Sequence, residues 1–187
     1  MWPLCVTRTL LAVRKFAVAV TLAWIFATAG CGAFGPEPPE SLREAASNAD
    51  WATARIAELP VRQGGKTQGI LYRPGAAPLK SESGEFGEYN YAKAILKGSE
   101  KSATQPELLA AASHVEVKAA ALMRKQKVSY AVLVINNTDG VCGDSTTGVC
   151  TTAVPIVLPD SYRLMVWWPD QQRRAQGPKA LDGKGSS

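Results

Sequence analysis

Residues 130–136 read Tyr-Ala-Val-Leu-Val-Ile-Asn, a continuous apolar run that is rich in β-branched side chains. Such a run is typical of a central strand that is buried on both of its faces. The next residues, Asn-Thr-Asp-Gly at 137–140, are a strong turn signal. We therefore expect the run to form the middle of a sheet and to end near residue 136.

Other strands and helices are expected on both sides of this run. Upstream, residues 66–73 and 77–81 predict two strands joined by a Pro-Gly turn. Residues 106–112 lead into the main helix, which is expected to run to about residue 125. Downstream, residues 150–158 predict a short helix and residues 163–168 a strand that is stopped by proline. The order β-β-α-β-α-β predicts a three-layer α/β domain.

The N-terminal segment has the features of an export signal. Three basic residues precede residue 16, residues 16–29 are apolar and uncharged, and small residues precede Cys31. Three interpretations remain open. The segment could be a lipoprotein signal with a lipidated, membrane-anchored Cys31, a simple secretion signal, or an uncleaved membrane anchor, since the uncharged run is just long enough to span a bilayer.

Composition divides the chain into four parts. We expect a signal segment over residues 1–30, a Pro/Ala-rich linker over 31–62, a folded domain over 63–170 and a flexible tail over 171–187. Within the linker, residues 41–59 could form a short helix. The net charge of +5 falls by three to +2 without the three basic residues of the signal, which is too little to predict nucleic-acid binding from charge alone.

A set of metal-binding residue types surrounds the apolar run. His114 is the only histidine, Glu116 follows it closely, and Cys142 and Cys150 are the only cysteines after Cys31. One histidine, two cysteines and a non-ligand glutamate form the zinc site of nucleobase deaminases, H-x-E…P-C-x-x-C. His114, Cys142 and Cys150 would hold Zn²⁺ and leave a fourth position for water, and Glu116 would shuttle protons.

Each half of this set also has a simpler interpretation. Ser113-His-Val-Glu116 matches the S-x-x-E capping box of a helix N-terminus. Cys142 and Cys150 could form a disulfide, which is the usual state of two cysteines in an exported protein. At this stage both alternatives stand beside the zinc site.

Several longer stretches carry a family resemblance. They are His-Val-Glu-Val-Lys-Ala-Ala-Ala-Leu-Met-Arg at 114–124, Val-Ile-Asn-Asn at 134–137, Gly-Val-Cys at 148–150, Val-Pro-Ile-Val-Leu-Pro at 154–159 and Gly-Lys-Thr-Gln-Gly-Ile-Leu-Tyr at 65–72. Together they resemble the DddA-like DNA cytosine deaminases, a family of bacterial polymorphic toxins. Two features depart from the general deaminase pattern: Val141 replaces the proline before the first cysteine, and seven residues separate the cysteines.

The resemblance implies a three-layer α/β/α cytidine deaminase-like fold with a mixed β-sheet. It also implies that His114, Cys142 and Cys150 bind Zn²⁺, that Glu116 is the catalytic residue, and that the chain converts cytosine to uracil in DNA. Asn137 is a candidate for substrate binding and equally for a turn. An immunity protein would be a further partner of such a toxin.

Two other functions remain open. The same site could deaminate free nucleosides or nucleotides. Alternatively, the chain could be a non-catalytic exported lipoprotein with a deaminase-like fold and a Cys142–Cys150 disulfide. Tyr89, Tyr91, Trp167 and Trp168 could stack on a base, although strand tryptophans are more often core residues.

Overall fold

The structure is a computed structural model that describes residues 40–63, 65–142 and 148–185. All of them lie in the second of two compact units, Ala33–Ser187. The predicted signal segment, Cys31 and residues 143–147 of the insertion between the cysteines lie outside the described residues. Among the helices of the described part, none is both long enough and apolar enough to cross a membrane.

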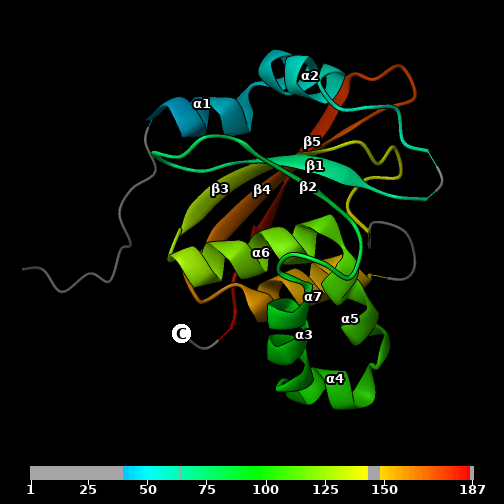
Figure 1. Ribbon diagram of the computed structural model, residues 1–187. Helices are drawn as coiled ribbons and strands as arrows, with labels where there is room; N and C mark the ends of the chain where they lie inside the picture. The colour runs from blue at the N-terminus through cyan, green and yellow to red at the C-terminus, as the bar shows by residue number, and fades with distance from the viewer. Residues whose placement is uncertain (1–39, 64, 143–147, 186–187) are drawn as a thin grey trace, which may run out of the picture. The chain divides into compact units, whose positions relative to one another are not determined.

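A five-stranded mixed sheet forms the centre of this unit, in the order β2-β1-β3-β4-β5 (Figure 1). The strands are β1 (Gln68–Tyr72), β2 (Leu79–Glu82), β3 (Tyr130–Ile135), β4 (Arg163–Pro169) and β5 (Ala175–Asp182). β3 and β4 are parallel, whereas the other neighbouring pairs are antiparallel. The apolar run is therefore the central strand, and the predicted α/β fold with a mixed sheet is confirmed.

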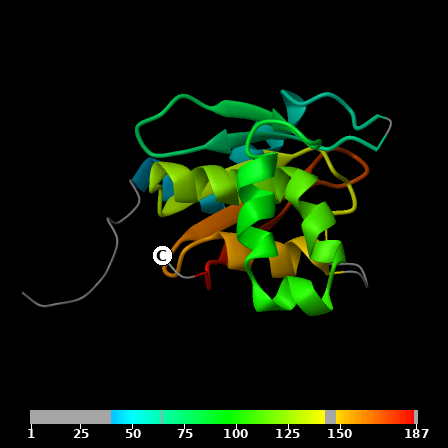
Figure 2. The same ribbon diagram turned by 60° about the horizontal axis from the view of Figure 1, so that its bottom comes forward.

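Helices cover both faces of the sheet and give the fold three layers (Figure 1 and Figure 2). On one face lie α1 (Glu40–Ser47) and α2 (Ala49–Ala57). On the other face lie α3 (Tyr89–Lys97), α4 (Glu100–Thr104), α5 (Glu107–Ala110), the 3-10 helix η1 (Ala111–Ser113), α6 (Val115–Gln126) and α7 (Val149–Val157).

The continuous apolarity of β3 follows from this sandwich. Val132 and Val134 pack in the cluster that includes residues of α1 and α2. Ala131, Leu133 and Ile135 point to the opposite face and pack in the cluster that includes residues of α6 and α7. All five are fully buried. Successive side chains of β3 point to opposite faces, and both faces are buried, so every position in the strand is apolar.

The folded unit begins earlier than the boundary predicted at residue 63. The helix expected over residues 41–59 is present as two helices, but residues 40–62 are not a linker. Leu42, Ile56 and Leu59 are buried against the sheet together with Ile70 and Trp167. The alanine-rich composition suggested a spacer, yet its small residues allow α1 and α2 to lie close to the strands.

The tail predicted over residues 171–187 contains the edge strand β5. This strand pairs antiparallel with β4, and a register irregularity lies between Val166 and Trp168. Gly177 and Pro178 interrupt its pattern, and most of its side chains are half-buried or exposed. Proline and weak alternation are tolerated at a sheet edge, because one side of an edge strand needs no backbone partner.

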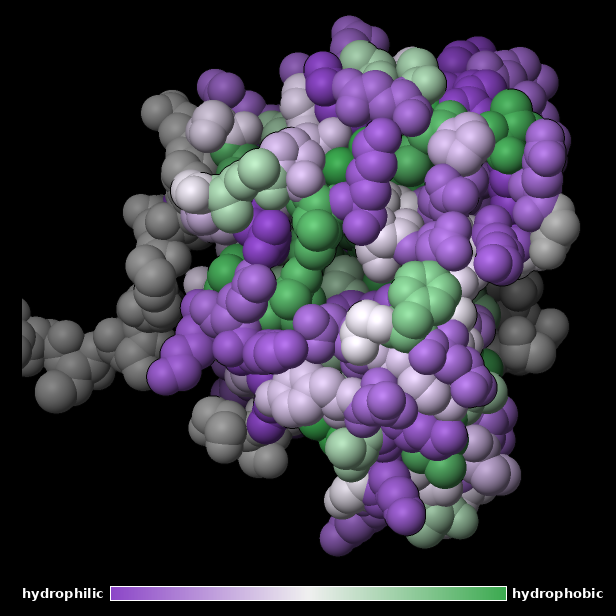
Figure 3. Space-filling view, viewed as in Figure 1, coloured by the Kyte–Doolittle hydropathy of each residue, from purple (hydrophilic) through white to green (hydrophobic). Residues whose placement is uncertain are grey.

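An apolar hollow lies between the β1–β2 hairpin and α6. Figure 3 shows hydrophobic side chains gathered there on the face seen in Figure 1. A cavity of about 190 Å³ in this region is lined by Leu71, Leu79, Phe86, Leu122 and Leu133, among others. It is distinct from the cavity that contains the predicted site residues.

Candidate metal centre and active site

His114 is positioned by a sharp change of backbone direction at the start of α6. It is the N-cap residue, with extended backbone angles of φ −78° and ψ 145°, and no side chain caps the helix. The Ser113 hydroxyl instead donates to the Ala110 carbonyl at 2.9 Å. The predicted capping box between Ser113 and Glu116 is therefore not formed.

Glu116 lies in the first turn of α6 and is only 2% exposed. Burial raises the pKa of its carboxyl group. Backbone hydrogen bonds from Glu116 and Cys142 and the charge of His114 oppose this rise, whereas the charge of Cys142 adds to it. A buried carboxyl group whose pKa is raised above its ordinary value is suited to accept and return a proton.

The two cysteines come from opposite ends of one connection. Cys142 is half-buried in the loop that follows β3, and Cys150 is fully buried in the first turn of α7. The Cys150 N–H donates to the Cys142 carbonyl at 3.0 Å. This bond brings the ends of the seven-residue insertion together, so both thiols reach one site despite their separation in sequence.

His114, Cys142 and Cys150 form a compact cluster of ligand atoms. One ligand atom from each residue lies within 4.8 Å of the other two. His114 Nδ1 is 3.0 Å from Cys150 Sγ. Both cysteines are free, so the disulfide predicted as an alternative is not formed. One imidazole nitrogen and two sulfurs in one compact cluster are a donor set that suits a zinc ion.

The two thiols have opposite protonation preferences. The hydrogen bond from Cys150 is the largest influence on Cys142 and lowers its pKa to about 5, with the charge of His114 acting in the same direction. The same hydrogen bond, followed by burial, raises the pKa of Cys150. The pair therefore holds one thiolate and one thiol near neutral pH. A thiolate beside an imidazole is a donor set that zinc prefers.

These residues open onto a polar cavity of about 240 Å³, which we call the catalytic cleft. Its lining includes His114, Glu116 and Cys142, and it also includes Thr67 and Ser83 from the β1–β2 side. The structure thus brings Glu116 and two of the three candidate ligands to the wall of one cavity, with Cys150 directly behind them.

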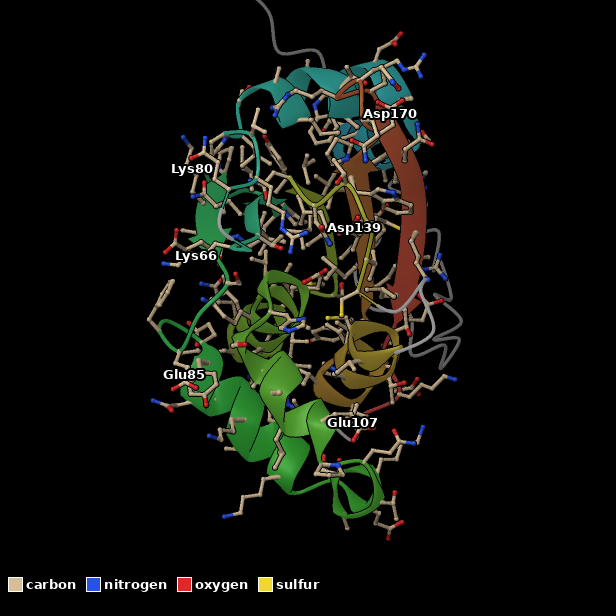
Figure 4. The ribbon with its side chains drawn as sticks, turned by 90° about the vertical axis from the view of Figure 1, so that its right-hand side faces the viewer. Lys66, Lys80, Glu85, Glu107, Asp139 and Asp170 are labelled. Carbon is tan, nitrogen blue, oxygen red and sulfur yellow. The ribbon has the colours of Figure 1, made fainter. Side chains whose placement is uncertain are left out.

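Asn137 also lines the catalytic cleft, and it serves as a turn residue at the same time. Its Nδ2 donates to the Gly140 carbonyl at 2.7 Å, and its Oδ1 accepts from the Asp139 N–H at 3.4 Å. Figure 4 shows Asp139 on the loop that follows β3. Both interpretations of Asn137 are compatible with this geometry, and its role in substrate binding stays a prediction.

Arg62 is a lining residue that the sequence did not suggest. Its Nη1 donates to Asn137 Oδ1 and, at 3.1 Å, to Asp139 Oδ2. Its Nη2 donates to the Gly65 carbonyl at 3.2 Å. Arg62 falls in the segment expected to be a linker, and it is separated from Asn137 by 75 positions. No local signal marks a contact of that range.

The four candidate stacking aromatics lie elsewhere. Tyr89 and Trp167 are 7% and 2% exposed in the two core clusters. Trp168 packs against the same core as Tyr89, and Tyr91 is exposed on α3. None of them is among the described residues that line the catalytic cleft. For Tyr89 and both tryptophans, the core-packing interpretation is the one that fits.

A mixed α/β sheet, a clustered histidine and two cysteines, and a buried glutamate beside them are together the arrangement of a deaminase. The family model of the SCP1.201-like deaminases matches residues 38–186, so the chain belongs to that family. No curated protein matches the chain. The family match confirms the deaminase part of the resemblance, and the narrower DddA-like group stays a prediction.

Proposed function

We propose that this chain is a zinc-dependent deaminase that converts cytosine to uracil in DNA and acts as an exported bacterial toxin. The observation that carries the proposal is the cluster of His114, Cys142 and Cys150 next to buried Glu116 in one polar cleft. Membership of a deaminase family supports hydrolytic deamination. The choice of cytosine in DNA rests on the resemblance to the DddA-like enzymes.

The residues present fit a zinc ion. The cluster offers one imidazole nitrogen and two sulfurs in a compact group, and the pair of thiols already favours one thiolate. Three protein ligands with an open fourth position are typical of catalytic rather than structural zinc sites. When bound, zinc would supply a water activated for attack near neutral pH.

Glu116 is proposed to move the protons of the reaction. Its carboxyl group would take a proton from the attacking water and deliver it to the N3 atom of the cytosine ring. A second proton transfer to the exocyclic nitrogen would let that group leave as ammonia, so that cytosine and water give uracil and ammonia. The raised pKa of Glu116 suits this role, because the group must hold and release a proton in turn.

The size of the catalytic cleft favours a single base as its occupant. About 240 Å³ is below the roughly 300–1,000 Å³ of pockets for drug-sized ligands. A base in duplex DNA would therefore have to leave the stack to enter. Asn137 is proposed to contact the entering nucleotide, since its Nδ2 makes one hydrogen bond within the described residues and has a second hydrogen to offer.

Export and toxicity are proposed on the N-terminal sequence and the family resemblance alone. The signal features support export, with Cys31 as a candidate lipidation site for membrane anchoring. DNA of a target cell would then be the macromolecular partner, and an immunity protein would protect the producing cell.

The test is the accumulation of uracil in DNA incubated with the zinc-supplemented full chain and with its Glu116→Gln variant. We expect uracil with the unchanged chain and a loss of at least about 100-fold in Glu116→Gln, as for removal of a general acid–base. Exposed Glu107 on α5 provides the matched control, and Glu107→Gln should retain full activity (Figure 4). Equal uracil with the Glu116 variant would overturn the assignment. Formation of deoxyuridine from deoxycytidine, without uracil in the DNA, would favour the free-nucleoside alternative.

A further inference from the structure

A second polar cavity adjoins the catalytic cleft, and we call it the side pocket. It has a volume of about 490 Å³, and Arg62 and Gly65 line both cavities. The turn after β3 separates the two: Asn137 and Asp139 line the catalytic cleft, whereas Asn136 and Thr138 line the side pocket. A ligand that fills the cleft and continues past Arg62 would therefore enter the side pocket.

Two arginines line the side pocket, and backbone carbonyls hold both. Arg62 Nη2 donates to the Gly65 carbonyl at 3.2 Å. Arg173 Nη2 donates to the Ile56 and Leu59 carbonyls at 2.6 and 2.7 Å. Fixed guanidinium groups lose little conformational freedom when they bind a ligand, and their planar arrays of donors match phosphate oxygens.

The nearby carboxylates do not cancel this positive charge. Asp170 lines the side pocket, but its carboxylate accepts from the Gln172 and Arg174 N–H groups and pairs with Arg174 Nε at 2.8 Å. Asp139 pairs with Arg62 at 3.1 Å, but its side chain is 77% exposed, so the pair is weak and a ligand anion can replace it. Arg173 has no carboxylate partner among the described residues. The side pocket is thus suited to an anionic group.

The positions of the two cavities suit a continuous strand. Figure 4 shows Asp139, from the catalytic cleft, and Asp170, from the side pocket, on the same face. Thr138 and Gln171 add polar side chains to the side pocket, and these are suited to sugar and phosphate oxygens. A nucleotide whose base occupies the cleft would place its neighbour along this face.

We propose that the side pocket binds a phosphodiester group of the substrate strand, next to the nucleotide whose base enters the catalytic cleft. Arg62 and Arg173 are the residues that contact this group. The inference rests on the proposed function, because it takes the base in the cleft to belong to a nucleic-acid strand.

The test measures binding without turnover. The full chain with Glu116→Gln is titrated against a fluorescein-labelled single-stranded oligonucleotide that contains cytosine, over a series of NaCl concentrations. Each phosphate contact on a single strand contributes about −0.7 to the slope of log Kobs against log [salt]. The double variant Arg62→Gln/Arg173→Gln should make the slope shallower by about 0.7, with each single variant giving part of that change. Arg173→Lys should keep the parental slope because it keeps the charge.

Arg163→Gln is the matched control. Arg163 lies on β4 at the other end from the site, is about half exposed and pairs with Asp182, so its loss removes the same charge away from both cavities. It should leave the slope unchanged. Unchanged slopes for Arg62→Gln and Arg173→Gln would overturn the inference, and so would an equal change in Arg163→Gln. Thermal melting checks folding, and Arg62→Gln decides the matter if Arg173→Gln does not fold.

The inference and the proposed function fail in different ways. Uracil formation with unchanged salt slopes would reject the side pocket and leave the deaminase assignment intact. If the unchanged chain forms no uracil but the arginine variants still have shallower salt slopes, the side pocket is retained as a strand-binding site and the proposed activity is rejected.

Discussion

Replacing Ile56 by alanine tests whether α2 is part of the folded domain. Ile56 is fully buried between α2 and the sheet, in a cluster with Ile70, Val132 and Val134. The change removes three carbons, which is about 2.4 kcal/mol at about 0.8 kcal/mol per buried CH₂ group. The cavity left behind adds to this loss, so we expect the free energy of unfolding to fall by about 3–4 kcal/mol, within the range of buried Ile→Ala changes.

Urea denaturation of the full chain measures this loss as a lower midpoint with an unchanged slope m. Val61→Ala is the control, because Val61 lies in the same segment but is 63% exposed, and it should change stability by less than about 0.5 kcal/mol. A loss below about 0.5 kcal/mol for Ile56→Ala would show that α2 does not pack on the sheet. Residues 31–62 would then be better described as the linker that the sequence predicted.

Two further predictions concern the site and its surroundings. Zinc binding near pH 7 should release about one thiol proton, because Cys142, with a pKa of about 5, is already a thiolate, whereas the pKa of Cys150 is raised. The zinc affinity should therefore rise with pH. Calorimetry in buffers of different ionisation enthalpy measures the number of protons released. No thiol proton released would contradict the proton distribution of the pair. Lys118→Met should lower the free energy of unfolding by about 1–3 kcal/mol, because it removes two contacts of a buried ammonium group. Lys118 Nζ donates to the Glu82 carbonyl at 2.6 Å and lies 3.8 Å from the centre of the Phe86 ring. Urea denaturation measures it, with exposed Lys125→Met as the control, and equal midpoints for the two variants would refute the role of these contacts.

The central elements of the fold could be predicted because their signals are local. The apolar run of β3 carries its two-sided burial in its own composition, and the β1 and β4 segments have β-branched or aromatic residues bounded by turns. The layer of α1 and α2 could not be predicted in the same way. Its short helices depend on apolar side chains such as Ile56 meeting β1 and β3, which is a contact between distant segments.

The edge strand β5 was missed for a related reason. Its sequence, Ala-Gln-Gly-Pro-Lys-Ala-Leu-Asp, has little intrinsic preference for a strand, and it is held by pairing with β4. Tertiary pairing overrides local preference here, whereas β3 would be recognised as a strand in almost any context.

The candidate site was partly predictable from residue type and order. A single histidine, a glutamate two positions later and two cysteines suggested one cluster, and the structure brings the three candidate ligands together. The sequence could not decide between the cluster and the simpler alternatives, because the capping box and the disulfide use the same residues. The difference depends on the extended backbone of His114, which makes it the N-cap of α6, and on the hydrogen bond from the Cys150 N–H to the Cys142 carbonyl.

The most direct test of the account is the metal and thiol content at Cys142 and Cys150 in the purified full chain. Native mass spectrometry measures bound zinc, and alkylation followed by peptide mapping measures the oxidation state of each of the two cysteines. The account predicts one zinc ion per chain, lost in Cys150→Ser, with both thiols reduced. A chain without metal whose Cys142 and Cys150 are joined in a disulfide would contradict it.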